Sequence, residues 1–131
     1  MDLVQQTYTL TQGLPKSEAY GLLAQMRRAA VSVRSNIAEG HGRLTDSQFR
    51  HFLGNARGSL CEMQTQLELA GDLGYLDEER VSELMGRGQE VARMINGLIA
   101  VLGKEREQAG AERLNSANNA NTANSARKGF Q

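Results

Sequence analysis

Apolar residues recur at steps of three and four along most of this chain, which is the spacing of one buried face of an α-helix. The longest stripe runs from Phe49 to Leu73 and would cover about seven helical turns. A second runs from Leu22 to Ile37, and others lie over residues 3–10 and 81–102. Alternation of apolar and polar residues, the mark of a half-buried strand, is scarce. The pattern therefore predicts an all-α protein.

Two of the predicted helices have clear start signals. Thr45 and Gln48 form a capping box for the third helix, and Leu44 and Phe49 fit a hydrophobic staple around it. Asp77 is a good N-cap for the fourth helix, because glutamates follow it in the first turn. The connections between the long helices are short, which makes neighbouring helices antiparallel. We therefore predict an up-down-up-down antiparallel four-helix bundle whose first helix is short.

Glycines mark the expected helix ends. Gly40 and Gly42 are expected to end the second helix, since both can take the left-handed conformation that closes a helix end, and Gly103 is expected to end the fourth. From residue 104 the chain is rich in Asn, Ala and Ser and has few large apolar residues, so it buries too little apolar surface to offset its ordering entropy. The bundle is assigned to residues 1–103, and residues 104–131 to the helix end and a disordered tail.

Other glycines fall at the end of the third helix and inside the fourth. Gly71 and Gly74 are expected to close the third helix. Gly86, Gly88 and Gly97 each weaken the fourth helix by about 1 kcal/mol relative to Ala. Their presence indicates close approach to a neighbouring helix.

Composition excludes several classes of protein. The 15 Lys and Arg residues balance the 15 Asp and Glu residues, so any electrostatic function must be local. Cys61 is the only cysteine, and we expect a buried thiol in a reducing compartment. No apolar run approaches the roughly 20 residues that span a bilayer, and the N-terminus lacks signal-peptide features. We expect a cytoplasmic protein with no membrane contact.

No arrangement of residues indicates an enzyme. His41, His51 and Cys61 are ten residues apart, whereas two metal ligands on one helix face are three or four apart. Gly40 and Gly42 flank His41 between two helices and do not follow a strand, so they are no phosphate-binding fingerprint. No Ser or Cys nucleophile has a base and an orienting partner nearby in the sequence. We therefore expect no catalytic residue, no metal and no cofactor.

Polar residues lie on or beside the apolar stripes of the second and third helices. Folding the hairpin about residue 42 brings Glu62 within reach of Arg27. The interpretation we favour is a polar network that fixes helix register. A carboxylate pair for acid-base chemistry is disfavoured because nearby arginines would keep both carboxylates ionised, and a role in a subunit interface is the other alternative. The residues of this predicted network are Asn36, Glu39, Ser59, Glu62 and Gln66.

Charge is distributed unevenly along the chain. Residues 16–57 contain seven basic and three acidic side chains, whereas residues 58–103 contain three basic and eight acidic ones. A basic side and an acidic side would suit head-to-tail self-association, or binding of phosphate backbones with an affinity that falls as salt rises. The alternative is that these charged helix faces are solvated and bind no partner. The candidate contact residues are Arg27, Arg28, Arg34, Arg43, Arg50 and Arg57.

Three motifs follow one another in the first part of the chain. They are Q-M-R-R-A-A-V-S at residues 25–32, N-I-A-E-G at 36–40 with Arg43, and A-R-G-S-L-C-E at 56–62 with Gln66. Their order and spacing resemble the 23S rRNA-intervening sequence proteins, a family that also includes accessory proteins of diversity-generating retroelements.

The resemblance covers about residues 1–76 and carries several expectations. It implies a small bacterial four-helix bundle that forms a homo-oligomeric ring, with five subunits in relatives. Its retroelement members bind a reverse transcriptase and nucleic acid through basic surface. We therefore expect a non-enzymatic accessory or scaffold protein whose partners are itself and RNA, DNA or a reverse transcriptase. The alternative is a purely structural homo-oligomer that binds no nucleic acid.

Overall fold

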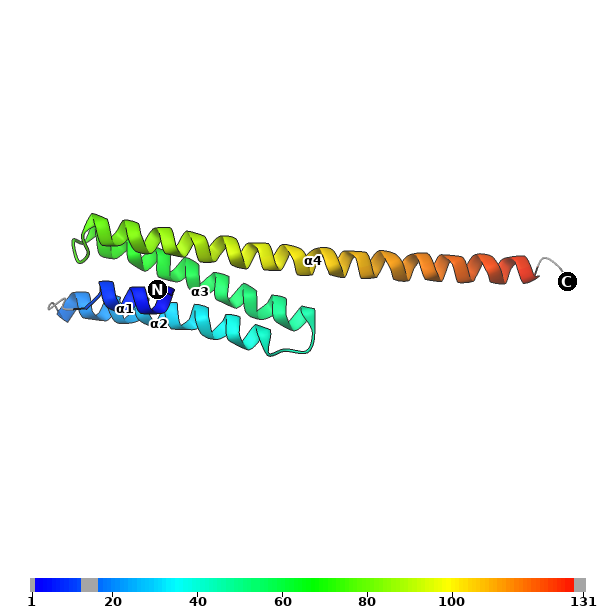
Figure 1. Ribbon diagram of the computed structural model, residues 1–131, viewed down its shortest axis with the longest axis horizontal. Helices are drawn as coiled ribbons and strands as arrows, with labels where there is room; N and C mark the ends of the chain where they lie inside the picture. Colours follow the sequence, from blue (N-terminus) through cyan, green and yellow to red (C-terminus); the bar gives the residue numbers. More distant parts are fainter. Residues whose placement is uncertain (1, 13–16, 129–131) are drawn as a thin grey trace. The chain divides into compact units, whose positions relative to one another are not determined.

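The computed structural model describes residues 2–12 and 17–128, with side-chain surroundings for residues 2–12, 19–103 and 110–121. All regular secondary structure in this part of the chain is helical and it contains no strand, which confirms the all-α prediction (Figure 1). The helices form a four-helix bundle in which α2 and α3 pack on each other and α1 packs on α2. The helices are α1 (Leu3–Leu10), α2 (Ser17–His41), α3 (Asp46–Asp72) and α4 (Glu78–Lys128).

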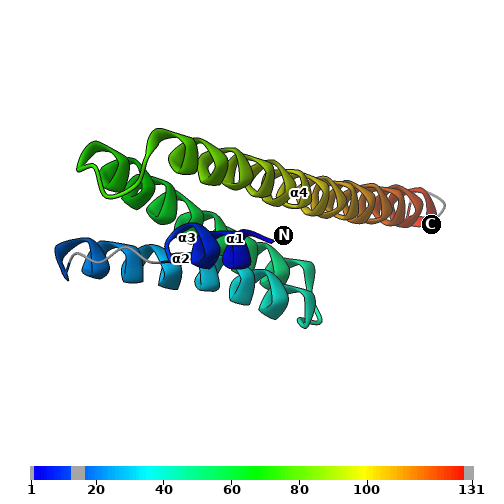
Figure 2. The same cartoon turned by 60° about the vertical axis from the view of Figure 1, so that its left-hand side comes forward.

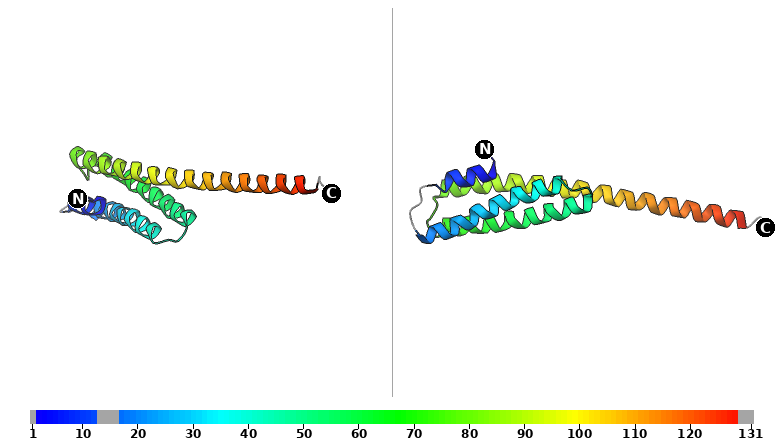
Figure 3. Two further views of the ribbon diagram at one scale, coloured as in Figure 1. Left: turned by 45° about the vertical axis from the view of Figure 1, so that its right-hand side comes forward. Right: turned by 90° about the horizontal axis from the view of Figure 1, so that it is seen from below.

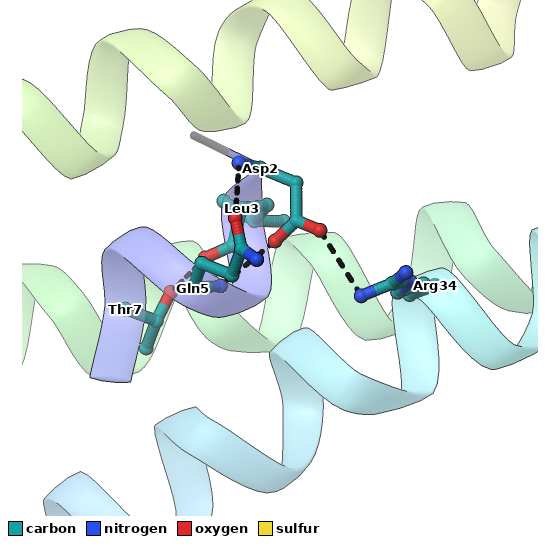
Figure 4. Close-up of polar contacts among 5 residues, drawn as sticks. All are labelled: Asp2, Leu3, Gln5, Thr7 and Arg34. Carbon is teal, nitrogen blue, oxygen red and sulfur yellow. Dashed lines mark hydrogen bonds and ion pairs between the residues drawn. The ribbon is translucent and has the colours of Figure 1, made fainter. Parts of the chain in front are cut away.

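The first helix is short, as predicted, and its start is capped by Asp2. The Asp2 carboxylate accepts a hydrogen bond from the backbone N–H of Gln5 at 2.8 Å, and the Gln5 side chain accepts one from the backbone N–H of Asp2. The same carboxylate forms an ion pair of 3.0 Å with Arg34 of α2 (Figure 4). A capping box therefore begins α1 and also fastens it to α2.

The other end of α1 is held by Arg27. Its Nε donates a hydrogen bond of 2.7 Å to the Thr11 hydroxyl, and its guanidinium lies 4.7 Å from the centre of the Tyr8 ring. Because Asp2 meets Arg34 and Thr11 meets Arg27, α1 runs antiparallel to α2 (Figure 2).

The core follows the predicted stripes closely. Along α3 the stripe is buried from Leu53 to Ala70, and its two ends, Phe49 and Leu73, are more exposed. On α2 the buried leucine is Leu23, while the predicted Leu22 is half-buried. The largest fully buried apolar side chains are Met26, Val33, Leu53, Leu60, Met63, Leu67, Leu84 and Ile95.

The turn between α2 and α3 differs from the prediction in two respects. Gly40 is buried inside α2, and neither it nor Gly42 is left-handed, since Gly74 is the described glycine with positive φ. A Cβ on Gly40 would lie 2.7 Å from Cδ2 of Phe49, so this glycine is needed for close approach of the ring. The predicted staple is also wrong, because Leu44 is 99% exposed and Phe49 packs on Gly40 instead.

The connection between α3 and α4 agrees better with the sequence. Gly74 has φ of +75° just after α3, as expected for a helix-closing glycine. Asp77 caps α4 by accepting a hydrogen bond of 2.8 Å from the backbone N–H of Arg80. Gly71 instead remains helical and lies against the Val81 side chain. The end of α3 and the start of α4 are therefore fixed by the residues that the sequence indicated.

Three glycines of α4 were predicted to lie close to a neighbouring helix. The structure confirms this for Gly88 only. A Cβ there would lie 3.1 Å from Nε2 of Gln64 and 3.6 Å from Cδ1 of Leu60. Cβ atoms at Gly86 and Gly97 would meet nothing within 4 Å. These two glycines lower helix propensity without a packing reason in this chain.

The fourth helix does not end at Gly103, as had been predicted. The chain divides into two compact units, residues 1–99 and 100–131, and the helix continues through Gly103 to Lys128. The physical reason is local, because Gly103 keeps a helical backbone and Glu, Arg, Gln and Ala, which follow it, favour helix. Residues 111–121 are all exposed, as expected for a segment with little to bury.

No helix in the described ranges is both long and apolar enough to cross a membrane.

Candidate functional site

The antiparallel hairpin of α2 and α3 sorts the charges to opposite ends of the bundle. Ser32 and Ser59 lie side by side, with their hydroxyl oxygens 2.8 Å apart, so the residues between them form the turn end. From residue 34 to 57 this end holds four arginines and two acidic residues. The stretch from 62 to 83 holds seven acidic residues and one arginine, and it includes the turn between α3 and α4 at the other end (Figure 3). The predicted basic side is therefore a basic end.

The six predicted arginines do not share one surface. Arg27 is half-buried and engaged with Tyr8 and Thr11, so it fastens α1 to α2. Arg34 is 67% exposed and pairs with Asp2 of α1. Arg57 is exposed and its guanidinium donates a hydrogen bond of 3.2 Å to the amide oxygen of Asn96 on α4.

The other three predicted arginines lie on the hairpin itself. Arg28 is exposed and borders a polar hollow together with Ser59 and Glu62. Arg43 is exposed at the turn and forms an ion pair of 2.9 Å with Glu39. Arg50 is half-buried in the first turns of α3. The turn end thus carries Arg34, Arg43, Arg50 and Arg57, while Arg27 and Arg28 lie beyond the serine contact.

Rings gather at the turn in an arrangement that the sequence analysis missed. The rings of His41 and Phe49 are 4.8 Å apart, and the guanidinium of Arg43 lies 4.6 Å from the centre of the Phe52 ring. His51 meets the same Phe52 edge-on at 5.5 Å. The available signal was the position of two histidines and two phenylalanines within about two turns of the predicted loop, but their mutual contacts require the hairpin geometry.

The predicted polar network separates into three groups. Asn36 donates hydrogen bonds to the backbone oxygen and the hydroxyl of Ser32, whose hydroxyl in turn meets Ser59 on α3. Gln66 donates to the Glu62 carboxylate at 3.3 Å. The first group joins the two helices, as a network that fixes register would.

The remaining member, Glu39, pairs with Arg43 at the turn. Glu39 and Glu62 lie on opposite sides of the contact between Ser32 and Ser59, so the structure does not bring them together as a carboxylate pair. Glu62 is bonded to Gln66, and the expected approach to Arg27 is replaced by the contacts of Arg27 with α1.

Titratable and thiol groups form no metal centre in the described residues, where no group of three or more His, Cys, Asp or Glu side chains is placed to hold an ion. The prediction that Cys61 is buried is wrong, because it is exposed on α3. Its neighbours along the buried stripe, Leu60 and Met63, take the inward positions.

An apolar hollow lies between α1, α2 and α4. It measures about 340 Å³ and is open to solvent. Leu3 of α1, Val33 and Ile37 of α2, and Val91 and Met94 of α4 contribute to its walls. Its position follows from the shortness of α1, which covers only part of the groove beside the longer α2.

The fold and these motifs define a small all-α protein of a known family. The family model of the 23S rRNA-intervening sequence proteins matches residues 1–97, and this chain therefore belongs to that family. The match extends beyond the 76 residues that the motifs covered and includes the first part of α4. No protein with a curated description matches the sequence.

The fold also resembles a solved structure. A crystal structure of a protein of unknown function from the S23 ribosomal protein family of Bacteroides thetaiotaomicron superposes with a TM-score of 0.62. The two sequences are 16% identical, and the alignment covers 74% of this chain and 97% of that one. At this identity the likeness concerns the fold alone.

Proposed function

We propose that this protein is a non-enzymatic, cytoplasmic homo-oligomer that acts as an accessory or scaffold factor, binding nucleic acid or a nucleic-acid enzyme through its basic end. The observation that carries the proposal is the collection of Arg34, Arg43, Arg50 and Arg57 at the α2–α3 turn while acidic residues dominate the opposite end. With zero net charge, such a protein attracts phosphate only where its cations gather.

The chemistry of the cations supports this proposal. All four are arginines, whose planar guanidinium groups donate to phosphate or carboxylate oxygens in pairs of hydrogen bonds. Three of them, Arg34, Arg43 and Arg57, are exposed. Their present partners are side chains on the protein surface, and such exposed contacts contribute little stability and exchange readily for a ligand.

A purely structural homo-oligomer is the second candidate, favoured by the same separation of charge. The basic end of one subunit would meet the acidic end of the next in a head-to-tail contact, and such contacts generate rings when the rotation closes. The ring would have five subunits by family resemblance. In this case the arginines would be covered by neighbouring subunits and unavailable to nucleic acid.

The two candidates are separated by nucleic-acid binding at low and high salt. We expect the protein to bind a fluorescent RNA hairpin and to lose affinity steeply as salt rises from about 50 to 200 mM, because condensed counterions are released on binding. Replacing Arg50 and Arg57 by Gln should weaken binding and reduce the slope of log affinity against log salt by up to about two.

Arg80→Gln is the matched control, since Arg80 lies at the acidic end beside Asp77. It should bind as the unaltered protein does. Absence of binding at low salt, with the oligomer intact, would contradict the proposal and leave the structural oligomer. An equal loss in the control variant would show that the basic end has no special role.

A further inference from the structure

Three planar polar side chains at the α2–α3 turn each contact a phenylalanine ring. His41 contacts Phe49, and both Arg43 and His51 contact Phe52. His41, Arg43 and His51 are exposed, whereas the phenylalanines are half-buried. The Arg43 guanidinium lies over the Phe52 ring, whereas the His41 ring is tilted by 46° against Phe49 and the His51 ring meets Phe52 edge-on. Each polar group therefore contacts a phenylalanine on one side and is open to solvent elsewhere.

The arrangement is held in place by packing. Phe49 lies against Gly40, where any side chain would collide with its ring, and Cβ of Phe52 lies 3.2 Å from the same Cβ position. Glu39 holds the Arg43 guanidinium through its ion pair, and the Asn55 amide contacts the His51 ring at 3.4 Å. The packing of Phe49 and Phe52 against Gly40 fixes the rings beside His41 and Arg43 before any ligand arrives, which lowers the entropy lost on binding.

Leu44 adds an apolar group to the same turn. It follows Arg43 directly, and its side chain is 99% exposed. Neither α2 nor α3 covers it, although the next apolar residue, Phe49, packs well. An exposed leucine next to planar polar side chains can make apolar contact with a ligand that is flat and has apolar faces.

The charges at the turn alone would not make it a binding site for phosphate. The Arg43 charge is balanced by Glu39, and Asp46 adds a negative charge in the first turn of α3. Attraction for phosphate would come from Arg34, Arg50 and Arg57, which lie farther along the helices. The turn itself offers stacking surfaces.

We propose that the α2–α3 turn binds unpaired nucleobases, which stack on the exposed faces of His41 and Arg43 beside Leu44. Guanidinium and imidazole planes stack on bases much as aromatic rings do, and stacking requires bases that are not enclosed in a duplex. The proposal rests on the proposed function and specifies its ligand as a single-stranded region of a nucleic acid. RNA and DNA share this chemistry.

The test measures affinity for a fluorescent unpaired RNA, the DNA strand of the same sequence, and a blunt duplex. Arg43→Lys keeps the charge and the reach to Glu39 but removes the plane. We expect it to weaken binding of the unpaired strands about tenfold, the range found when one stacking contact is lost, with little change for the duplex. Leu44→Ala should act in the same direction by a smaller factor.

Arg80→Lys and Leu73→Ala are the controls, because Arg80 is at the acidic end and Leu73 is an exposed leucine away from this turn. Both should bind as the unaltered protein does. Stronger binding of one strand type would identify the ligand as RNA or DNA. The stacking proposal would be overturned if the Arg43→Lys variant bound unpaired strands normally, or if its affinity fell equally for strands and duplex. In either case the proposal that the basic end binds nucleic acid would still stand. Failure of the unaltered protein to bind any of the three would overturn both.

Discussion

Gly40 and Phe49 are in direct contact across the α2–α3 turn, and a Cβ on Gly40 would lie 2.7 Å from Cδ2 of the ring. Gly40 is buried within α2, so the helix does not need it as a terminator. Its role is to admit the ring, which in turn supports His41. The glycine of the N-I-A-E-G motif therefore serves the packing of the turn.

Gly40→Ala should destabilise the protein. Alanine raises helix propensity by about 1 kcal/mol, but the collision with Phe49 costs about 1–3 kcal/mol, so we expect the free energy of unfolding to fall by up to about 2 kcal/mol. Gly58→Ala is the matched control, because Gly58 is an exposed helical glycine with nothing within 4 Å of its Cβ position. It should gain about 0.5–1 kcal/mol. Urea unfolding followed by circular dichroism measures both, and a stabilised Gly40→Ala would refute the packing role.

Asp2 should stabilise α1 mainly as a cap. Asp2→Ala removes the cap and the ion pair with Arg34, and we expect a loss of about 1 kcal/mol. Asp2→Asn keeps a capping side chain and removes only the exposed ion pair, whose contribution is less than about 1 kcal/mol. Thermal unfolding at low and high salt separates the two effects. Equal losses in both variants would show that the ion pair dominates.

Ser32 and Ser59 should be energetically coupled. Their hydroxyl oxygens are 2.8 Å apart, and Asn36 donates a hydrogen bond to Ser32. In a double-mutant cycle of Ser32→Ala and Ser59→Ala, we expect a coupling free energy of about 0.5–1.5 kcal/mol. A coupling near zero would mean that the pair does not help to fix the register of α2 against α3.

Cys61 should react readily in the native protein. It is exposed on α3, so a thiol reagent should modify it within a few-fold of the rate measured in urea. Cys61→Ser provides the blank. If the thiol reacted only after unfolding, Cys61 would be buried in the native protein, in contradiction to its exposed position on α3.

The helices and their buried stripes were predictable from sequence because periodicity and caps act locally. The stripe of α3 and the caps at Thr45 and Asp77 appear in the structure as expected. The errors came from contacts between helices. A glycine at position 40 is consistent both with a helix end and with close packing of an aromatic ring. Only the position of Phe49 in the folded hairpin distinguishes these two roles.

The candidate site was less predictable for the same reason. Arg27 and Arg34 were identified by their charge, but both are engaged by residues at the two ends of α1, which the sequence did not indicate. Arg43 was identified by charge, whereas its stacking on Phe52 depends on the path of the turn. Past Gly103, composition alone did not reveal that the backbone stays helical to Lys128.

The central claim is that an oligomer of this bundle binds nucleic acid through its basic end. Light scattering after size-exclusion chromatography, at low and high salt and with a labelled RNA, measures assembly and binding together. We expect a multiple of the 14.3 kDa subunit that binds RNA at low salt and releases it as salt rises. An oligomer of the same mass that does not bind the RNA at low salt, or a monomer under all conditions, would contradict this expectation.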